Sequence, residues 1–279
     1  MKHFLSVCLI VKSKFPHELI QWVLWHKFIG VDHFYIYDDG CDFDLKDALK
    51  KFEASITYVK KGNEKRTRKK HQIFIYEKVF NKYKNCSKWM AFIDEDEYIF
   101  SPNDKNFLSF LLKYEDCDQI NLIWRMFSPA GKVKNQTHEK LILGDFNYYK
   151  LNRFTKSIVN CESKNVKVKN QHDFLETGKK VDCFGKNIEI IHQQCNDCVY
   201  DNPDFIINHY SFISVENIFY KTFERGEVNF NNDTRKIKKL IRELSSLTNQ
   251  EKVKEFDFKK SPQYLKFKAF YEKLGFDYK

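Results

Sequence analysis

The residues most able to do chemistry are four consecutive acids, Asp94, Glu95, Asp96 and Glu97, which follow a short apolar run. Residues 90–93 have the continuous apolar character of a buried parallel strand. Carboxylates crowded at the end of such a strand repel one another and lose hydration, so a divalent cation is their expected partner. Ligands of open α/β sheets bind at the carboxyl ends of strands. The sequence therefore predicts a binding site here, with a solvated acidic loop as the alternative.

Alternating strands and helices precede the acids. Expected strands cover residues 4–11, 31–37 and 54–59, and expected helices cover 17–29, 44–52 and 72–83. The first helix has Pro16 at its start and Gly30 just past its end, as helix punctuation requires. This pattern predicts an α/β fold of the doubly wound, nucleotide-binding type. The absence of G-x-G-x-x-G and Walker-type loops argues against a dinucleotide fold and a P-loop enzyme.

The second half is less regular. Short strands are expected at residues 120–125, 156–159 and 166–168, and Ser214 is the expected cap of a helix that runs to about residue 224. From residue 234 onward the chain is rich in lysine and predicted to be helical, with one apolar face formed by Ile237, Leu240, Ile241 and Leu244.

The chain is basic, with 48 lysine and arginine residues against 38 acids and a formal net charge of +10. This charge suits nucleic acid, an anionic membrane surface or a phosphorylated substrate. No segment has the length of a transmembrane helix, and the apolar run at residues 5–11 lacks the features of a signal peptide. A cytoplasmic protein is therefore expected.

Eight cysteines are scattered along the chain, and only Cys195 and Cys198 have ligand-like spacing, with His192 just before them. A structural zinc site normally needs a second matched pair of ligands. Reduced cysteines in a loop are the favoured interpretation.

Several motifs together resemble those of glycosyltransferase family 92 and related family 2-like enzymes. They are the runs at residues 22–26, 30–40 and 89–99, and shorter pieces at 124–127, 172–174 and 209–226. Their combined spacing is more specific than a lone D-x-D. The resemblance implies a GT-A fold, a nucleotide-sugar donor and inversion of the anomeric centre.

The resemblance covers roughly residues 5–226 and extends the fold prediction to the second half of the chain. It implies a GT-A type, Rossmann-like domain over residues 1–226, with a mixed, mostly parallel sheet flanked by helices. Residues 1–100 would be the nucleotide-sugar-binding half and 101–226 the acceptor-side half, and a basic helical extension would cover 227–279. Lys12-Ser13-Lys14 replaces the usual Lys-Asn-Glu, and Ile213 stands where a lysine is common. The family's donor preference is therefore not transferred.

The resemblance also implies a cation site for Mn²⁺ or Mg²⁺. Asp94 and Asp96 are the expected acidic ligands, because alternation along an extended backbone would turn both side chains the same way. His209 matches a later histidine that completes metal or diphosphate binding, and a core histidine is its rival interpretation. Glu97 is expected to orient a ligand or to bond the backbone.

The donor is expected to be a nucleotide sugar, UDP-linked in the first instance. Asp38 and Asp39 would lie near the base and ribose, unless they only form a turn. Lys12, Arg66 and Arg68 are candidates for the phosphates. The residues expected to bind the donor are Lys12, Asp38, Asp39, Arg68, Gln72 and Asp94.

Inversion needs a base for the acceptor hydroxyl. Asp173, beside His172, is the candidate, with Glu139, Asp145 and Glu176 as near rivals. The expected acceptor is a glycan or a lipid-linked sugar, with membrane contact through the basic C-terminus and no nucleic acid partner. Two alternatives remain: a metal-dependent nuclease or phosphatase, and a non-catalytic basic module that binds nucleic acid or membrane.

Overall fold

The computed structural model describes residues 1–60, 68–128, 132, 141–191, 193–195, 202–211, 213–221 and 254–275. The chain forms two compact units. Unit 1 comprises residues 1–124 and 152–207, and unit 2 comprises residues 125–151 and 208–279. The predicted boundary at residue 226 lies outside the described residues.

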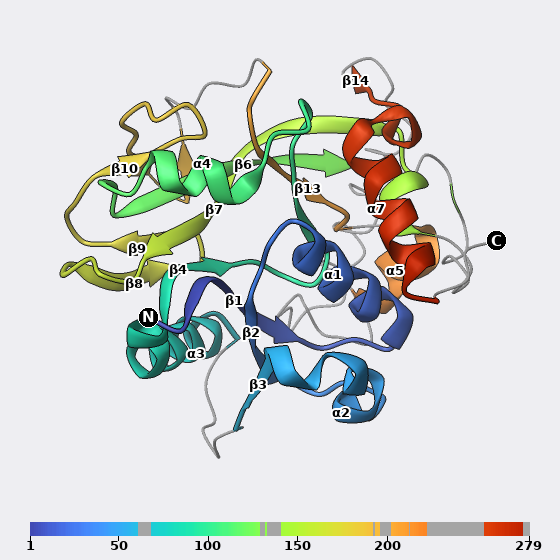
Figure 1. The fold of residues 1–279 in the computed structure, drawn as a ribbon, viewed down its shortest axis with the longest axis horizontal. Coiled ribbons are helices and arrows are strands. Elements are labelled where there is room, and N and C mark those ends of the chain that lie inside the picture. The colour runs from blue at the N-terminus through green and yellow to red at the C-terminus, as the bar shows by residue number, and fades with distance from the viewer. Residues whose placement is uncertain are drawn as a thin grey trace, which may run out of the picture. The chain divides into compact units, whose positions relative to one another are not determined.

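The N-terminal part of unit 1 alternates strands and helices as predicted (Figure 1). Its elements in chain order are β1 (His3–Val11), α1 (Pro16–Phe28), β2 (His33–Asp38), α2 (Leu45–Ala48), β3 (Ile56–Val59), α3 (Arg68–Tyr83), β4 (Ser87–Phe92), β5 (Glu97–Phe100) and α4 (Phe107–Lys113). The helix expected at residues 44–52 is shorter, because α2 gives way to a 3₁₀ segment, η1 (Lys50–Ser55).

The second part of the chain is richer in strands than predicted. These strands are β6 (Gln119–Phe127), β7 (Tyr148–Asn160), β8 (Val166–Asn170), β9 (Asp173–Leu175), β10 (Lys180–Val181), β11 (Ile190–Ile191), β12 (Gln194–Cys195) and β13 (Ile206–His209). The main sheet has the order β3-β2-β1-β4-β7-β6-β13-β5. β1 pairs in parallel with β2 and β4, β2 pairs in parallel with β3, and β7 is antiparallel to β4. The expected mixed, mostly parallel sheet is confirmed.

Neighbouring residues of β2 show how both faces of this sheet are covered. Phe34 packs on Trp22 of α1, with ring centroids 5.9 Å apart, and Tyr35 stacks on Tyr83 of α3 at 4.2 Å. Successive side chains of a strand point to opposite faces, so α1 and α3 cover opposite faces. This is the doubly wound arrangement that the sequence predicts.

The strand order reverses at β1, which has β2 on one side and β4 on the other. The crevice at such a reversal is where open α/β sheets bind ligands. The register pairs Cys8 with Phe92 and Val11 with Asp38. Lys12, Asp39 and the acids after β4 therefore follow the carboxyl ends of three neighbouring strands.

Two tryptophans of α1 fix the strand that follows the acids. The indole N–H of Trp22 donates to the carbonyl of Glu97 at 2.7 Å, and that of Trp25 donates to the carbonyl of Ile99 at 2.8 Å. Both indoles are fully buried, so each polar N–H needs such a partner. β5 is thereby tied to α1.

Gly30 ends α1 with a backbone that only glycine adopts easily. Its φ is +106°, and the amides of Gly30 and Val31 donate to the carbonyls of Lys27 and His26. These bonds are those of a Schellman motif, which satisfies the last carbonyls of the helix.

Gly30→Ala is expected to destabilise unit 1 by about 1–3 kcal/mol, measured by thermal unfolding. An added Cβ would lie 2.8 Å from the side chain of Leu108 and would strain the left-handed backbone. Gly40→Ala is the matched control, because Gly40 has φ +114° with no atom within 4 Å of an added Cβ. An equal loss in both variants would show that the contact with Leu108 contributes nothing.

Unit 2 contains η3 (Ile142–Gly144), α5 (Val215–Phe219), β14 (Lys254–Glu255), η6 (Phe258–Lys260) and α7 (Pro262–Lys273). Ser214 caps α5 as predicted, accepting from the amide of Asn217 at 2.9 Å. The cap of α7 is Ser261, which accepts from the amide of Tyr264. The predicted apolar face at residues 237–244 lies outside the described residues.

Cys195 is disulfide-bonded, so the expectation of reduced cysteines is wrong for this residue. It is buried at the end of β12, and Cys198 lies outside the described residues. Six other cysteines are free thiols. Burial raises the pKa of Cys183 to about 12, which disfavours the reactive thiolate there.

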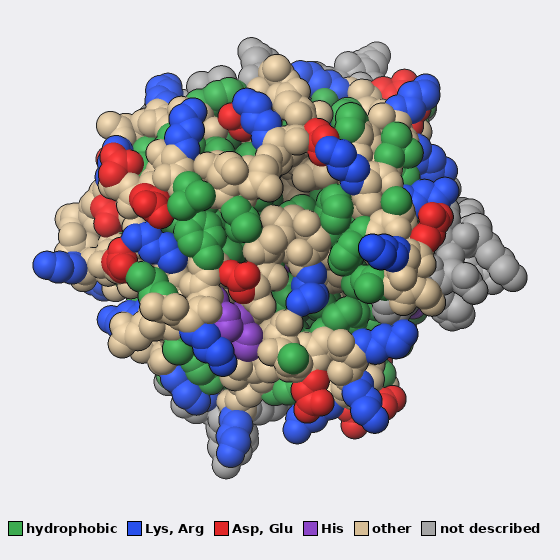
Figure 2. Space-filling model, in the orientation of Figure 1, with side chains coloured by type: hydrophobic (Ala, Val, Ile, Leu, Met, Phe, Trp, Pro, Cys, Tyr) green, Lys and Arg blue, Asp and Glu red, His purple; other side chains and the backbone are tan. Residues whose placement is uncertain are grey.

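On the face drawn in Figure 2, the lysine and arginine side chains of the described residues are interspersed with acidic side chains and do not form one dominant basic patch. Within the described part of the chain, no helix combines the length and apolar character needed to cross a membrane.

Candidate active site

The acids after β4 form a tight turn and not an extended strand. The amide of Glu97 donates to the carbonyl of Asp94 at 3.1 Å, and the amide of Asp94 donates to Oε2 of Glu97 at 2.9 Å. Residues 95 and 96 are the corner of this turn. The expected alternation of Asp94 and Asp96 is therefore wrong, because an i to i+3 hydrogen bond bends the backbone between them.

A buried lysine faces this turn. Nζ of Lys156 lies 2.7 Å from Oδ2 of Asp94 and 3.3 Å from Oε2 of Glu97. The Lys156 and Glu97 side chains are 1% and 0% exposed, whereas that of Asp94 is 30% exposed. Burial lowers the pKa of Lys156, but the attraction of Asp94 and Glu97 outweighs it and raises the pKa above its ordinary value. Lys156 is therefore charged at neutral pH.

The other oxygen of Asp94 accepts from α3. Nε2 of Gln72 lies 3.4 Å from Oδ1 of Asp94 and donates to the hydroxyl of Tyr76 at 3.0 Å, and that hydroxyl lies 3.3 Å from the same Oδ1. Gln72 and Tyr76 are four residues apart and share one face of the helix. Burial, and then the charge of Asp94, raise the pKa of Tyr76 well above its ordinary value, so its hydroxyl stays a donor. Gln72 thus faces the acidic turn, and its contact with the donor stays a prediction.

The two aspartates at the carboxyl end of β2 have different surroundings. Oδ1 of Asp38 accepts from the amides of Gly40 and Cys41, both at 2.9 Å, so its carboxylate closes the D-D-G turn. Oδ1 of Asp39 lies 3.2 Å from Nε2 of His71, and its side chain is 34% exposed. Asp39 with His71 is therefore the more accessible pair for a ligand at this edge.

The candidate phosphate-binding cations are only partly described. Lys12 follows β1 directly and is half-buried. Arg68 is the first residue of α3, and its side chain is outside what the structure describes, as is Arg66. These assignments stay predictions.

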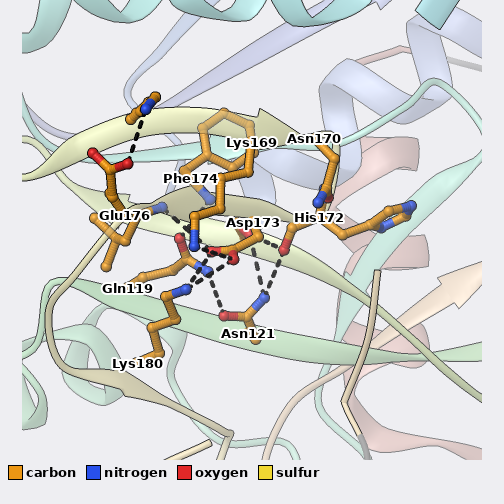
Figure 3. A network of polar contacts seen from close by, with 12 residues as sticks. Gln119, Asn121, Lys169, Asn170, His172, Asp173, Phe174, Glu176 and Lys180 are labelled. Carbon is orange, nitrogen blue, oxygen red and sulfur yellow. Dashed lines mark hydrogen bonds and ion pairs between the residues drawn. The ribbon is translucent and has the colours of Figure 1, made fainter. Parts of the chain in front are cut away.

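Asp173 lies in a polar network of unit 1 (Figure 3). Its side chain is 2% exposed, and Lys180 bridges both of its oxygens at 2.7 and 2.8 Å. The same network links Gln119 and Asn121, and Asn121 donates to the carbonyl of His172 at 3.1 Å. These contacts are typical of a carboxylate that stabilises the fold, and they give no support to a general base.

The structure gives no more support to the other candidates for the general base. Glu176 forms an exposed ion pair with Lys167 at 2.9 Å, and Asp145 of unit 2 pairs with Lys132. Glu139 lies outside the described residues. His172 is buried between the rings of Trp124 and Phe154, and its Nδ1 donates to the carbonyl of Thr155 at 2.6 Å.

Two motif pieces more than 80 residues apart meet inside unit 2. Nε of Arg125 donates to Oδ1 of Asn208 at 2.8 Å, and Phe127 stacks on Tyr210 with centroids 4.8 Å apart. The Arg125 guanidinium also lies 4.4 Å from the ring of Phe256. Burial lowers the pKa of Arg125 to about 10. His209 is 7% exposed in this unit, and its role in a cation site stays a prediction.

Asp94 does not fit the role of a metal ligand as it is placed. Its Oδ2 accepts a hydrogen bond from the ammonium of Lys156, and its Oδ1 accepts hydrogen bonds from Gln72 and Tyr76. Among the side chains that the structure describes, no three histidines, cysteines or acids form a group able to hold a cation.

Sequence reasoning missed Lys156, Tyr76 and His71. Lys156 opened the apolar run at residues 156–159, and a single lysine in a buried strand is a signal for a buried carboxylate partner. Tyr76 is an apolar-face residue by its spacing in the helix, and nothing in the sequence joins its hydroxyl to Asp94. His71 precedes Gln72, but nothing in the sequence joins it to Asp39.

A doubly wound α/β sheet, with acids, a glutamine and a histidine gathered at the strand-order reversal, is the arrangement of a nucleotide-binding α/β fold. The sequence pattern of glycosyltransferase family 92 matches residues 3–245, and the chain belongs to this family.

Individual relatives are distant. A glycosyltransferase family 92 protein of Oryza sativa subsp. japonica is 22% identical over 135 residues, which cover 47% of this chain and 23% of that protein. One of Arabidopsis thaliana is 24% identical over 106 residues, covering 38% and 18%. The matches thus span less than a quarter of either relative. Among solved structures, S. aureus TarS 1–349 in complex with UDP is 11% identical with a TM-score of 0.40, over 86% of this chain and 70% of that chain.

Proposed function

We propose that this protein transfers a single sugar from a nucleoside diphosphate sugar, UDP-linked in the first instance, to a hydroxyl of a glycan or lipid-linked acceptor, with inversion. Family membership supports sugar transfer over the nuclease, phosphatase and basic-module alternatives. The observation that carries the proposal is the clustering of Asp39, His71, Gln72 and Asp94 at the strand-order reversal. Such an edge suits a nucleoside and its diphosphate.

The residues of this edge have separate tasks in the proposed reaction. Asp39 and His71 offer polar groups to the nucleoside, while Gln72 and Tyr76 orient Asp94. Inversion is a single displacement, in which the acceptor oxygen attacks the anomeric carbon as the bond to the diphosphate breaks. The hydroxyl proton passes to a base, for which Asp173 remains a prediction. Membrane contact through residues 227–279 and a cytoplasmic location also remain predictions.

A screen of nucleotide sugars tests this function. The purified protein is expected to release the nucleoside diphosphate from one UDP- or GDP-sugar, slowly with water and faster with an acceptor glycan. Asp96→Ala is expected to lower this release at least ~100-fold, because this partly exposed acid at the corner of the turn remains the predicted ligand of a divalent cation, which would stabilise the departing diphosphate. Lys167→Ala, at an exposed ion pair, is the control that should retain activity. Cleavage of phosphodiesters without release from any nucleotide sugar would instead support a nuclease.

A further inference from the structure

Lys156 is held in its position by the sheet. The β4–β7 register pairs Trp89 with Asn160 and Ala91 with Ile158. If this antiparallel register continues for two more residues beyond Ala91 and Ile158, Lys156 lies opposite Ile93, at the start of the acidic turn. The lysine therefore approaches Asp94 from a paired strand and not from a mobile surface segment.

The neighbours of Lys156 on β7 fix the direction of its side chain. Thr155 Oγ1 and Ser157 Oγ accept from Nδ2 of Asn121 at 2.9 and 3.2 Å. Because side chains alternate along a strand, Lys156 must point to the opposite face, where Asp94 and Glu97 lie. The side chain of Lys156 is 1% exposed, so its ammonium is shielded from water.

The charges explain why this lysine and a metal compete. Lys156 offsets one of the two negative charges of Asp94 and Glu97, and it lies 2.7 Å from the oxygen that faces it. A divalent cation bound to the same oxygen at about 2.1 Å would lie within a few ångströms of the ammonium. Repulsion between two cations at that separation is poorly screened beside buried groups.

We propose that Lys156 is the resident counter-ion of the acidic turn, which positions Asp94 and Glu97 and keeps a divalent cation off Asp94. Asp94 then acts as an oriented carboxylate, and any cation required by the reaction is bound without it. This inference rests on the proposed function only in treating the turn as part of the donor site.

Mn²⁺ titrations in the absence of nucleotide test the inference. Lys156→Met leaves two carboxylates without their counter-ion, so it is expected to bind Mn²⁺ at least ~10-fold more tightly than the wild type. Mn²⁺ should also raise the midpoint of thermal unfolding of this variant more than that of the wild type. Adding Asp94→Asn to Lys156→Met should remove both gains. Lys156→Arg keeps the charge and should behave as the wild type.

Lys180→Met is the matched control, because Lys180 also bridges a buried carboxylate, that of Asp173. It is expected to lower stability without changing the response to Mn²⁺. Equal Mn²⁺ affinity in folded Lys156→Met and the wild type would overturn the inference. If Lys156→Met does not fold, Asp94→Asn in the wild-type background decides: weakened Mn²⁺ binding overturns the inference, and unchanged binding supports it. Failure of the proposed function would appear separately, as a wild type that binds no nucleotide.

Discussion

Lowering the pH from 6.5 to 4 is expected to remove about 3 kcal/mol of the stability of unit 1 through His26 alone. This imidazole is fully buried and lies against Trp22, with ring centroids 4.2 Å apart, and Tyr98. Burial lowers its pKa from 6.5 to about 3, although the hydrogen bond from Nδ1 to the carbonyl of Trp22 opposes that shift. The imidazole of His26 therefore stays neutral in the folded protein between pH 6.5 and 4.

The sign of this effect follows from proton binding. Between pH 6.5 and 3 the unfolded chain binds a proton at His26 that the folded protein does not. The free energy of unfolding therefore falls by about 1.4 kcal/mol for each pH unit in that range, and the full stability returns above it. Urea unfolding at pH 7, 6, 5 and 4 measures this slope.

Carboxylates also titrate in acid, so the effect of His26 is read from the difference between variants. His26→Phe is expected to flatten the slope by about 1 kcal/mol per pH unit between pH 6 and 4. Trp25→Phe is the matched control from the same helix, because it removes the bond to the carbonyl of Ile99 and no titrating group. It should lower stability equally at all these pH values. A slope unchanged by His26→Phe would rule out this account.

The fold of the first 100 residues was predictable because each element is buried on a regular pattern. β1, β2 and β4 carry continuous apolar runs, and α1 has Pro16 and Gly30 at its ends. β7 was predicted as only four residues, whereas it has 13. Its first seven residues are half-buried or exposed, so they give no apolar signal. Their strand conformation depends on pairing with segments far away in sequence, as Tyr149 pairs with Lys254.

The sequence predicts the strand ends of the candidate site but not its contacts. The D-D-G turn and the acids lie at the ends of β2 and β4, as the apolar runs before them predict, and their roles in binding stay predictions. The turn that separates Asp94 from Asp96 depends on Glu97, whose side chain bonds back to the amide of Asp94. The partner of Asp94 comes from a strand 62 residues later. No local pattern specifies a long-range pair of this kind.

Glu97→Ala is expected to destabilise the protein by about 3–5 kcal/mol, which lowers the midpoint of thermal unfolding by about 10 °C. Glu97 is fully buried, so its removal leaves the amide of Asp94 without this acceptor and Lys156 with a single counter-ion. Glu97→Gln should lose less, because the amide oxygen still accepts while the charge is lost. Glu176→Ala is the matched control, since its ion pair with Lys167 is exposed and water replaces the lost partner. Thermal unfolding of the three variants at pH 7 therefore separates a buried counter-ion from a surface one, and equal midpoints for Glu97→Ala and Glu176→Ala would show that the acidic turn contributes nothing to the fold.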